Sequence, residues 1–432
     1  GNAYLEAKPF KGLTFRSVIG TVLGSSRTGR YFGTQSIANP VAGYKVPAAV
    51  IDNQRIVNYR WENILTYDFD LNDDHRFSLT GVTSLAKNRA ESSSAGGSGF
   101  DLDSYSFHNL AAASSTIISS AFVQDQSTSF VGRMNYNYKG KYLLSVSNRW
   151  DGVSRLSVGH KWDSFPAAAA AWRISDEGFF KDIKNVTSLK LRVGYGITGN
   201  SGGVGAYGTQ AGGYNALRPR GFGDVAAPAF ILNQLLANRD LGWEKSYNTN
   251  VGLDAEFFKG IVSLTVDWYN TDTKDMLFQR ELPGSLGGSW GAPFKIWQNI
   301  GEMNNRGLEI LINTRNIEKD NFSWGTTFTF AANKEKITSL PGGKDLVSGN
   351  YFYGQPIKTY FNYKYLGIWQ ENEAAEAAKY NSVPGDIKLQ TDGTFNSDGK
   401  HPYGPNDRVV LGSDVPDWTA GLQNNIKYKN FD

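Results

Sequence analysis

Two short glycine motifs in this chain have the letter patterns of binding or catalytic loops. Residues 194–199 read GYGITG, which matches GxGxxG after a predicted strand. The next residues, 200–203, read NSGG and cannot begin the helix whose N-terminus would hold a pyrophosphate. Residues 287–291 read GGSWG and match GxSxG, but they lie in a Pro/Gly-rich loop and not between a strand and a helix. We therefore expect neither dinucleotide binding nor hydrolase chemistry, and no enzymatic activity.

The titratable residues offer one weak metal candidate. The four histidines are scattered without the spacing of metal ligands or of a proton relay: His75, His108, His160 and His401. Oxygen ligands at short spacing, which calcium prefers, occur within residues 385–410: Asp392, Asn396, Asp398 and Asp407. The spacing of an EF-hand is missing, and no glutamate closes the loop. The favoured interpretation is a solvated turn cluster, with calcium at Asp392, Asn396 and Asp398 as the weaker alternative, and no cofactor is expected.

Composition favours strands and long irregular connections. The 432 residues include 22 Tyr, 25 Phe, 11 Trp and 48 Gly, a balance typical of β-structure. Mean hydropathy is -0.40, and no window resembles a membrane-spanning helix of about 20 apolar residues. A transmembrane β-barrel remains compatible, because only alternate residues of its strands meet lipid. The net charge of +3 comes from interspersed signs, which predicts no nucleic-acid partner, and the chain contains no cysteine.

A hairpin at residues 128–150 shows the clearest strand pattern, with a turn at residues 139–141. Side chains alternate between an apolar and a polar face with a period of two residues. The apolar set is Phe130, Met134, Leu144 and Val146, and the polar set is Arg133, Asn135, Ser147 and Arg149. This alternation suits either one face of a soluble sandwich or the lipid-facing wall of a barrel.

The connections between strands distinguish these two folds. Short predicted turns at residues 72–74, 139–141 and 258–260 alternate with long Gly/Asn/Ser-rich segments at residues 21–57, 86–126 and 199–241. Outer-membrane barrels have this asymmetry, with short periplasmic turns and long external loops, whereas compact soluble domains rarely contain repeated long loops. We therefore predict an all-β fold, a transmembrane antiparallel β-barrel, and count about fourteen strands in this chain.

Two segments have ambiguous propensities. Residues 167–171 are five alanines, which favour helix, but Pro166 before them and Trp172 after them predict a strand of small residues. Residues 372–380 (NEAAEAAKY) predict a short helix in an external loop, with acidic residues early and Lys379 late. Further strands are expected near residues 360–368 and 419–428.

Several segments resemble the SusC/RagA-type TonB-dependent outer-membrane transporters. Their order and spacing match over most of the chain: residues 141–155 (KYLLSVSNRWDGVSR), 165–166 (FP) with 172–175 (WRIS), 189–200 (LKLRVGYGITGN), 241–245 (LGWEK), 267–271 (DWYNT), 299–309 (NIGEMNNRGLE), 384–388 (PGDIK) and 407–412 (DRVVLG). The resemblance implies a barrel of about 22 strands around an N-terminal plug. We expect residues 1–432 to be part of such a barrel, a piece of a longer polypeptide whose plug and final strands lie outside this chain.

The same resemblance implies partners. They are a SusD-like surface lipoprotein, a TonB complex that acts through the missing N-terminal part, the lipid of a Gram-negative outer membrane, and a dimer of transporter–lipoprotein pairs. The family's Asp-rich stretch is interrupted here by residues 400–405 (KHPYGP), which weakens any inherited calcium role.

The expected function is active import of an oligosaccharide or oligopeptide nutrient. Aromatic rings in external loops can stack on sugar rings or peptide side chains, and loop position alone selects Trp290, Trp297, Tyr351 and Tyr353 as candidate substrate-binding residues. A structural role is the simpler interpretation for each. The alternative function, from another class, is a secreted or surface carbohydrate-binding or adhesive β-protein, which would share the aromatic content and the long loops.

Overall fold

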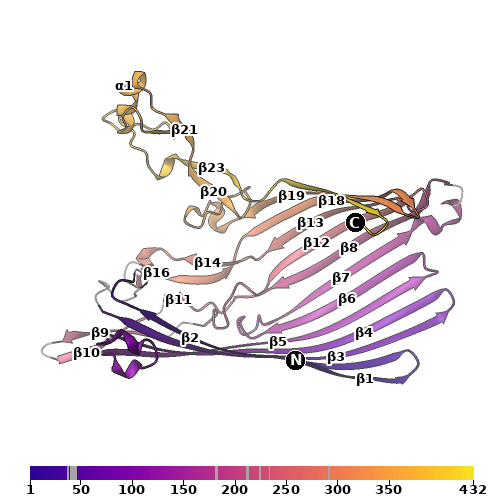
Figure 1. The fold of residues 1–432 in the computed structure, drawn as a ribbon, viewed down its shortest axis with the longest axis horizontal. Coiled ribbons are helices and arrows are strands. Elements are labelled where there is room, and N and C mark those ends of the chain that lie inside the picture. Colours follow the sequence, from indigo (N-terminus) through magenta and orange to yellow (C-terminus); the bar gives the residue numbers. More distant parts are fainter. Residues whose placement is uncertain are drawn as a thin grey trace. The chain divides into compact units, whose positions relative to one another are not determined.

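Antiparallel strands dominate the computed structural model of this chain (Figure 1). The structure describes residues 1–36, 38, 46–180, 183–210, 214–222, 225–232, 234–289 and 292–432. These residues divide into two compact units. The first comprises Gly1–Arg173, Gly194–Lys245 and Leu277–Asn299, and the second comprises Ile174–Val193, Ser246–Met276 and Ile300–Asp432. Each unit is described by itself below.

The first unit is built on seven long strands that are hydrogen-bonded in chain order. In Figure 1 they form a continuous run from indigo to magenta. Every neighbouring pair from β1 to β7 is antiparallel. The strands are β1 (Asn2–Phe10), β2 (Leu13–Phe32), β3 (Ala48–Asn72), β4 (His75–Ser98), β5 (Ser115–Tyr138), β6 (Tyr142–Val153) and β7 (Trp162–Arg173).

Shorter strands of the first unit lie in its long connections. They are β9 (Tyr214–Phe222), β10 (Val225–Leu232), β11 (Leu235–Leu236), β14 (Leu277–Glu281), β15 (Gly288–Ser289), β16 (Ala292–Pro293) and β17 (Lys295–Asn299). Strands β9 and β10 pair as a hairpin, and β17 lies between β11 and β14 in a small sheet. Two strands, β8 (Val186–Asn200) and β12 (Glu244–Phe257), contribute residues to both units.

The second unit contains the later long strands, and β13, β18, β19 and β24 pair in that order. Two small sheets, β20–β23 and β21–β22, belong to the connection between β19 and β24. The elements are β13 (Val262–Lys274), β18 (Glu302–Lys319), β19 (Phe322–Ser339), β20 (Thr359–Tyr363), β21 (Tyr365–Ile368), α1 (Ala374–Ala377), β22 (Ile387–Leu389), β23 (Arg408–Ser413) and β24 (Trp418–Tyr428).

Short turns join the strands at one end of each hairpin, as the sequence predicts. Between β5 and β6, Lys139 and Gly140 have φ values of 55° and 69°, the left-handed conformation that tight hairpin turns require. The Asn137 side chain accepts a hydrogen bond from the Gly140 N–H at 2.8 Å. Lys139 also donates its backbone N–H to the Asp74 carbonyl at 2.7 Å, which ties this turn to the turn between β3 and β4.

The strand register separates apolar from polar side chains, as predicted for the hairpin at residues 128–150. Opposite Met134 lies Val146, and opposite Arg133 lies Ser147. Because side chains alternate between faces, each pair stays on one side of the sheet. The predicted apolar set therefore shares one face, where Phe130 is 46% and Val146 is 42% exposed. Large hydrophobic side chains exposed on one face are what a lipid-facing wall presents.

An aromatic row follows the short turns across the apolar face of β3 to β7. Each ring contacts the next, with centroids from 4.7 Å (His75 and Tyr138) to 6.4 Å (Tyr142 and Trp172) apart. In contact order the rings are Tyr67, Phe69, Phe77, Tyr136, His75, Tyr138, Tyr142 and Trp172. Such a row is typical of an aromatic girdle at a membrane interface.

A second set of rings lies farther along the same face. Phe130 and Trp162 stack with centroids 6.0 Å apart, and Trp150 is directly opposite Phe130. Trp150 follows Tyr142 by eight residues on β6. At roughly 3.3 Å per residue this is about 26 Å along the strand, or roughly 20 Å across a membrane for a strand tilted by about 40°. The two aromatic sets thus bound an apolar band somewhat shorter than the roughly 25 Å typical of outer-membrane barrels.

Two predicted loops are in fact mostly strand. Residues 21–57 were expected to be a loop, yet β2 extends to Phe32 and β3 begins at Ala48, with Phe32 paired to Ala48. Residues 86–126 were also expected to be a loop, yet β4 extends to Ser98 and pairs there with Ser115 of β5. Backbone pairing continues where the alternation stops, because beyond the second set of rings both faces of a strand can be polar.

Of the remaining predictions about secondary structure, some are confirmed and others are wrong. The polyalanine segment is confirmed as a strand, β7, and the helix predicted for residues 372–380 is confirmed as α1 with short 3-10 turns on either side. Residues 199–241 were predicted to be a loop, but they include the β9–β10 hairpin. Residues 360–368 are β20 and β21, which pair within their own connection and add nothing to the wall. Among the described residues, thirteen strands therefore form the main meander, one fewer than the count of about fourteen made from barrel periodicity.

No helix among the described residues combines the length and apolar character needed to cross a bilayer.

The face assignment predicts opposite outcomes for adjacent arginine substitutions. In the full-length protein, Val146→Arg places a charge in the apolar band at a cost of about 2–4 kcal/mol near the bilayer midplane, whereas Ser147→Arg adds one to the polar face. We expect Val146→Arg to reduce the heat-modifiable, folded form on gels after outer-membrane extraction, and Ser147→Arg to leave most of it. Equal tolerance of both substitutions would contradict the assignment.

Candidate functional site

The polar face of the first unit carries paired charges. Arg149, on β6, donates from Nε to Asp151 Oδ2 at 2.7 Å and from Nη2 to Ser129 Oγ at 3.0 Å. Arg155 donates to Asp125 Oδ2 at 2.9 Å. These polar and charged side chains lie on one face of the wall, and the side chains next to them in sequence lie on the apolar face. The polar side therefore suits the inside of a pore.

A three-strand charge cluster lies in the second unit. Arg192 of β8 donates from Nε and Nη2 to the two carboxylate oxygens of Asp254 on β12, at 2.8 and 3.0 Å. The same Nη2 donates to Asp267 Oδ2 on β13 at 3.0 Å. Gly252 leaves space for this arrangement, because a Cβ there would lie 2.4 Å from Asp267 Oδ1. A guanidinium with two carboxylates fixes three adjacent strands more rigidly than a single exposed ion pair does.

Long connections of the first unit pack into an apolar cluster. Its most buried side chains, Leu156, Val204 and Leu241, are 1%, 1% and 0% exposed. Trp297 of β17 packs against this cluster, and its carbonyl accepts a hydrogen bond from Asn238 Nδ2 at 2.7 Å. These connections are therefore ordered by their own core.

The glycine motif at residues 194–199 has a packing role. The residues lie within β8, as a strand end and not a nucleotide loop. A Cβ at Gly199 would fall 2.2 Å from the Phe165 ring, and a Cβ at Gly196 would fall 3.0 Å from Ala167 Cβ. Glycine thus allows β7 and β8 to pack closely.

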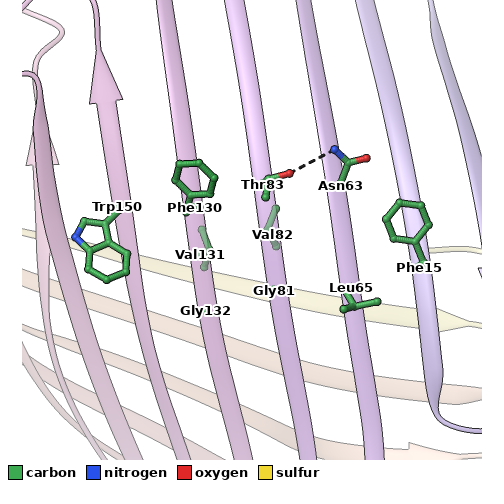
Figure 2. Close-up of a pocket in the computed structure, with 10 residues that line it drawn as sticks. All are labelled: Phe15, Asn63, Leu65, Gly81, Val82, Thr83, Phe130, Val131, Gly132 and Trp150. Carbon is green, nitrogen blue, oxygen red and sulfur yellow. Dashed lines mark hydrogen bonds between the residues drawn. The ribbon is translucent and has the colours of Figure 1, made fainter.

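A hollow of about 520 Å³ lies on the apolar face of the first unit (Figure 2). Its floor is the facing pair Gly81 and Gly132, which have no side chains. Three rings rim it: Phe15, Phe130 and Trp150. The polar atoms at its edge include the Asn63 amide, which donates to Thr83 Oγ1 at 3.3 Å. The hollow is a shallow feature of the face assigned to lipid.

The predicted substrate-binding aromatic residues that the structure describes do not cluster together. Trp290 lies outside the described residues. Trp297 is half-buried against the loop core of the first unit, so its ring has a structural contact. Tyr351 is half-buried and forms a bridge with Leu346 in the second unit. Tyr353 is 66% exposed, and among these described aromatics its ring is the most open to a ligand.

Residues 340–417 form a folded arm in the connection between β19 and β24. Because β18 and β19 meet at a short turn, this connection leaves the opposite end of β19, on the side of the long loops. The ring of Tyr380 is sandwiched between Trp369 and Tyr403, with centroids 5.4 and 5.5 Å away. Lys388 Nζ lies 4.2 Å from the centroid of the Trp369 ring. The arm has its own aromatic core.

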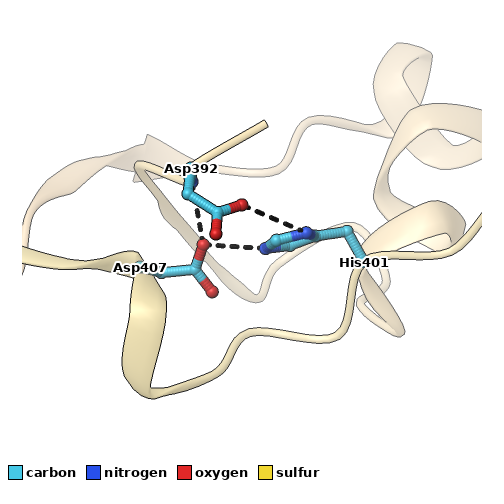
Figure 3. Close-up of side chains that lie close together, drawn as sticks. All are labelled: Asp392, His401 and Asp407. Carbon is cyan, nitrogen blue, oxygen red and sulfur yellow. Dashed lines mark hydrogen bonds and ion pairs between the residues drawn. The ribbon is translucent and has the colours of Figure 1, made fainter. Parts of the chain in front are cut away.

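The acidic stretch of this arm brings together Asp392, His401 and Asp407 (Figure 3). His401 Nε2 is 2.7 Å from Asp407 Oδ1, and His401 Nδ1 is 3.8 Å from Asp392 Oδ1. Asp407 is 2% and His401 8% exposed. The sequence identified the two aspartates but missed the histidine, since the chain must loop back for His401 to reach them.

Two of the predicted calcium candidates lie outside this cluster. The Asn396 carbonyl accepts the Gly399 N–H at 2.9 Å, and Asp398 Oδ1 accepts the Lys400 N–H at 3.1 Å. Both bonds close an exposed turn. Asp392 belongs to the group of residues whose ligand atoms converge, and Asp398 does not.

The Arg192 cluster predicts a measurable contribution to barrel stability. Arg192→Ala leaves Asp254 and Asp267 without their guanidinium donors, which should lower the free energy of unfolding by on the order of 1–3 kcal/mol. The measurement is the urea midpoint of the full-length protein refolded into lipid vesicles. The control is Arg60→Ala, which removes an ion pair to Glu62 at 3.6 Å with the arginine side chain 64% exposed, and should change stability by less than about 0.5 kcal/mol. Equal effects would contradict a stabilising role for Arg192.

Comparison with known proteins places the chain in a family. The profile of the TonB dependent receptor-like β-barrel family matches residues 10–429. The chain is 32% identical over 444 residues to TonB-dependent receptor P3 of Formosa agariphila, covering 100% of this chain and 43% of that protein. It is 31% identical over 309 residues to TonB-dependent receptor SusC of Bacteroides thetaiotaomicron, covering 70% of this chain and 30% of that protein.

A solved structure of the RagAB peptide transporter shares the fold. The TM-score is 0.81 at 22% identity, over 99% of this chain and 46% of that chain. The chain thus spans less than half the length of these relatives. The family consists of receptors and transporters, which confirms that the chain is not an enzyme. The chain belongs to the TonB-dependent receptor-like β-barrel family and is of the SusC/RagA type.

Proposed function

We propose that the full-length protein imports an oligosaccharide or oligopeptide nutrient across the outer membrane of a Gram-negative bacterium. The observation that carries this proposal is the division of the wall into an apolar face with aromatic rows and a polar face with paired charges. Family membership adds support. A secreted adhesive protein would have no use for an apolar band bounded by aromatic rows, so we favour transport.

The wall contributes to transport by keeping two solvents apart. Its apolar face meets lipid, while the polar face keeps a plug and a passing substrate hydrated. The Arg192 cluster holds three neighbouring strands in register on the polar side. Such a wall supplies a fixed frame, and movement belongs to the plug and the external loops.

Substrate would be held by the external loops. Tyr353 is the leading residue because its ring is 66% exposed and can stack on a sugar ring or an apolar peptide side chain. Tyr351, Trp290 and Trp297 are secondary candidates, and Trp297 already packs against the loop core. RagAB is a peptide transporter, which keeps an oligopeptide beside an oligosaccharide as a candidate substrate for this chain.

Three partners follow from this function. A TonB complex would supply energy through the N-terminal part of the full-length protein. A SusD-like lipoprotein would cover the external side, and the folded arm offers it exposed apolar side chains: Tyr360, Tyr365, Leu366, Ile368 and Ile387. Two such transporter–lipoprotein pairs would associate as a dimer.

Uptake in the native bacterium tests this proposal. We expect cells that lack the gene to lose TonB-dependent uptake of one fluorescent oligosaccharide or oligopeptide pool, and the wild-type gene to restore it. A protonophore should abolish the restored uptake, because energy comes from the inner membrane. Restoration by Tyr353→Ala should be weaker than by Tyr353→Phe, which keeps the stacking surface. Unchanged uptake of both pools in the deletion strain would contradict the proposal.

A further inference from the structure

The cluster of Asp392, His401 and Asp407 has a proton arrangement that can be worked out from its contacts (Figure 3). His401 Nδ1 lies within hydrogen-bond distance of the Thr394 carbonyl oxygen. A carbonyl oxygen only accepts, so Nδ1 must carry a hydrogen. His401 Nε2 lies 2.7 Å from Asp407 Oδ1. The protonation of this second nitrogen depends on whether Asp407 is ionised.

Asp407 is surrounded by donors. Its Oδ1 accepts the Asp392 N–H at 2.9 Å, and its Oδ2 accepts the Gly404 N–H at 2.7 Å. Burial opposes ionisation, but the Gly404 and Asp392 N–H groups and the imidazole hold the pKa of Asp407 below its usual value of 3.8. An ionised carboxylate can only accept, so Nε2 must also donate. With hydrogens on both nitrogens, the ring of His401 is an imidazolium.

The same contacts leave few free oxygen atoms to bind a metal ion. Calcium takes six to eight oxygen ligands, but both Asp407 oxygens already accept hydrogen bonds. Asp392 Oδ1 accepts the Thr394 N–H at 2.8 Å. Asn396 and Asp398 accept hydrogen bonds within an exposed turn, and the Asp398 carboxylate does not converge on the cluster. The residues present do not fit the calcium role that the family's acidic stretch implies.

We propose that His401, as an imidazolium, takes the place of a bound cation between Asp392 and Asp407 and holds the external arm closed without a metal. The contacts cross-link separate segments of this connection. The Asp407 side chain accepts the backbone N–H of Asp392, and the backbone N–H of His401 donates to the Lys379 carbonyl at 2.7 Å. The Tyr380 and Phe395 rings each lie in a T-shaped arrangement with the His401 ring, with both centroids 5.9 Å away. This inference does not depend on the proposed transport function.

The cross-link should depend on pH in a defined direction. The hydrogen bond to the Thr394 carbonyl, followed by contacts with Asp407 and Asp392, raises the pKa of His401 above its usual 6.5 against the effect of burial. A raised pKa means that its stabilisation is complete below pH 6.5 and is lost as pH rises through the folded pKa. Asp407 adds stabilisation that is present above pH 3.8 and is lost only at lower pH. The titratable groups that face the ring are Asp392, Asp407 and Tyr380.

Two measurements on the full-length transporter in detergent test the proposal. Nitrogen NMR of histidine-labelled protein at pH 6, assigned through His401→Gln, should show hydrogens on both ring nitrogens. Amide hydrogen exchange of residues 392–407 should show protection at pH 6 that is lost as pH rises through the folded pKa. Neither EDTA nor added calcium should change that protection in the wild-type protein.

Two variants distinguish the role of the His401 ring from a general loss of structure in the arm. His401→Gln should lose protection in residues 392–407 at pH 6 and lose the pH dependence. The control His160→Gln, an exposed histidine of the first unit, should keep the wild-type profile. A neutral ring at pH 6, loss of protection in EDTA, or extra protection from calcium would each overturn the proposal, and the EDTA and calcium tests need only wild-type protein.

Discussion

The rest of this structure depends on the need to satisfy every backbone hydrogen bond inside hydrocarbon. No water is present there to pair with a free N–H or carbonyl group, so strands can lie in hydrocarbon only when they are continuously paired. The ladders of β2 to β5 meet this condition, with pairing that continues from Leu13–Tyr67 to Phe32–Ala48. Once pairing is fixed, the two-residue period determines which side chains lie on each face of the wall.

That period makes each strand serve two environments. Val146 and Ser147 are adjacent in sequence, but their partners across the β5–β6 ladder are Met134 and Arg133. A shift of one residue would exchange the two faces, so register and solvent preference reinforce one another. The aromatic row beside the short turns and the second set around Phe130, Trp150 and Trp162 mark where the apolar band ends. Glycines adjust the packing between strands, as Gly252 does by leaving space for Arg192 and Asp267.

Sequence could predict the wall because its signal is local. The period at residues 128–150, the turn at residues 139–141 and the strand character of the alanines all follow from neighbouring residues. Strand length could not be predicted, because alternation stops at the edge of the apolar band while backbone pairing continues to Phe32 and Ser98. The chain-order meander followed from the turns. The strands expected near residues 360–368 exist, but their partners, β23 and β22, lie in the same connection and not in the meander.

The candidate sites were harder to predict because they depend on contacts between distant segments. His401 reaches Asp407 and Thr394 only because the arm folds back on itself, and its lack of ligand spacing hid it in the sequence. Trp297 looked like a loop aromatic, yet it packs against a core formed by four separate segments. Tyr353 was selected by its loop position, and its side chain is exposed.

The most direct test of the central claim is the solvent that each residue of β6 meets. This chain contains no cysteine, so single cysteines at positions 142–150 of the full-length protein can each carry one nitroxide label without competition from this region. In lipid vesicles, we predict that labels at Leu144 and Val146 are relaxed by oxygen, and labels at Ser145 and Ser147 by a water-soluble nickel complex. Accessibility should alternate with a period of two residues. Equal access of the nickel complex to both sets would contradict a wall with one face in lipid and one in water.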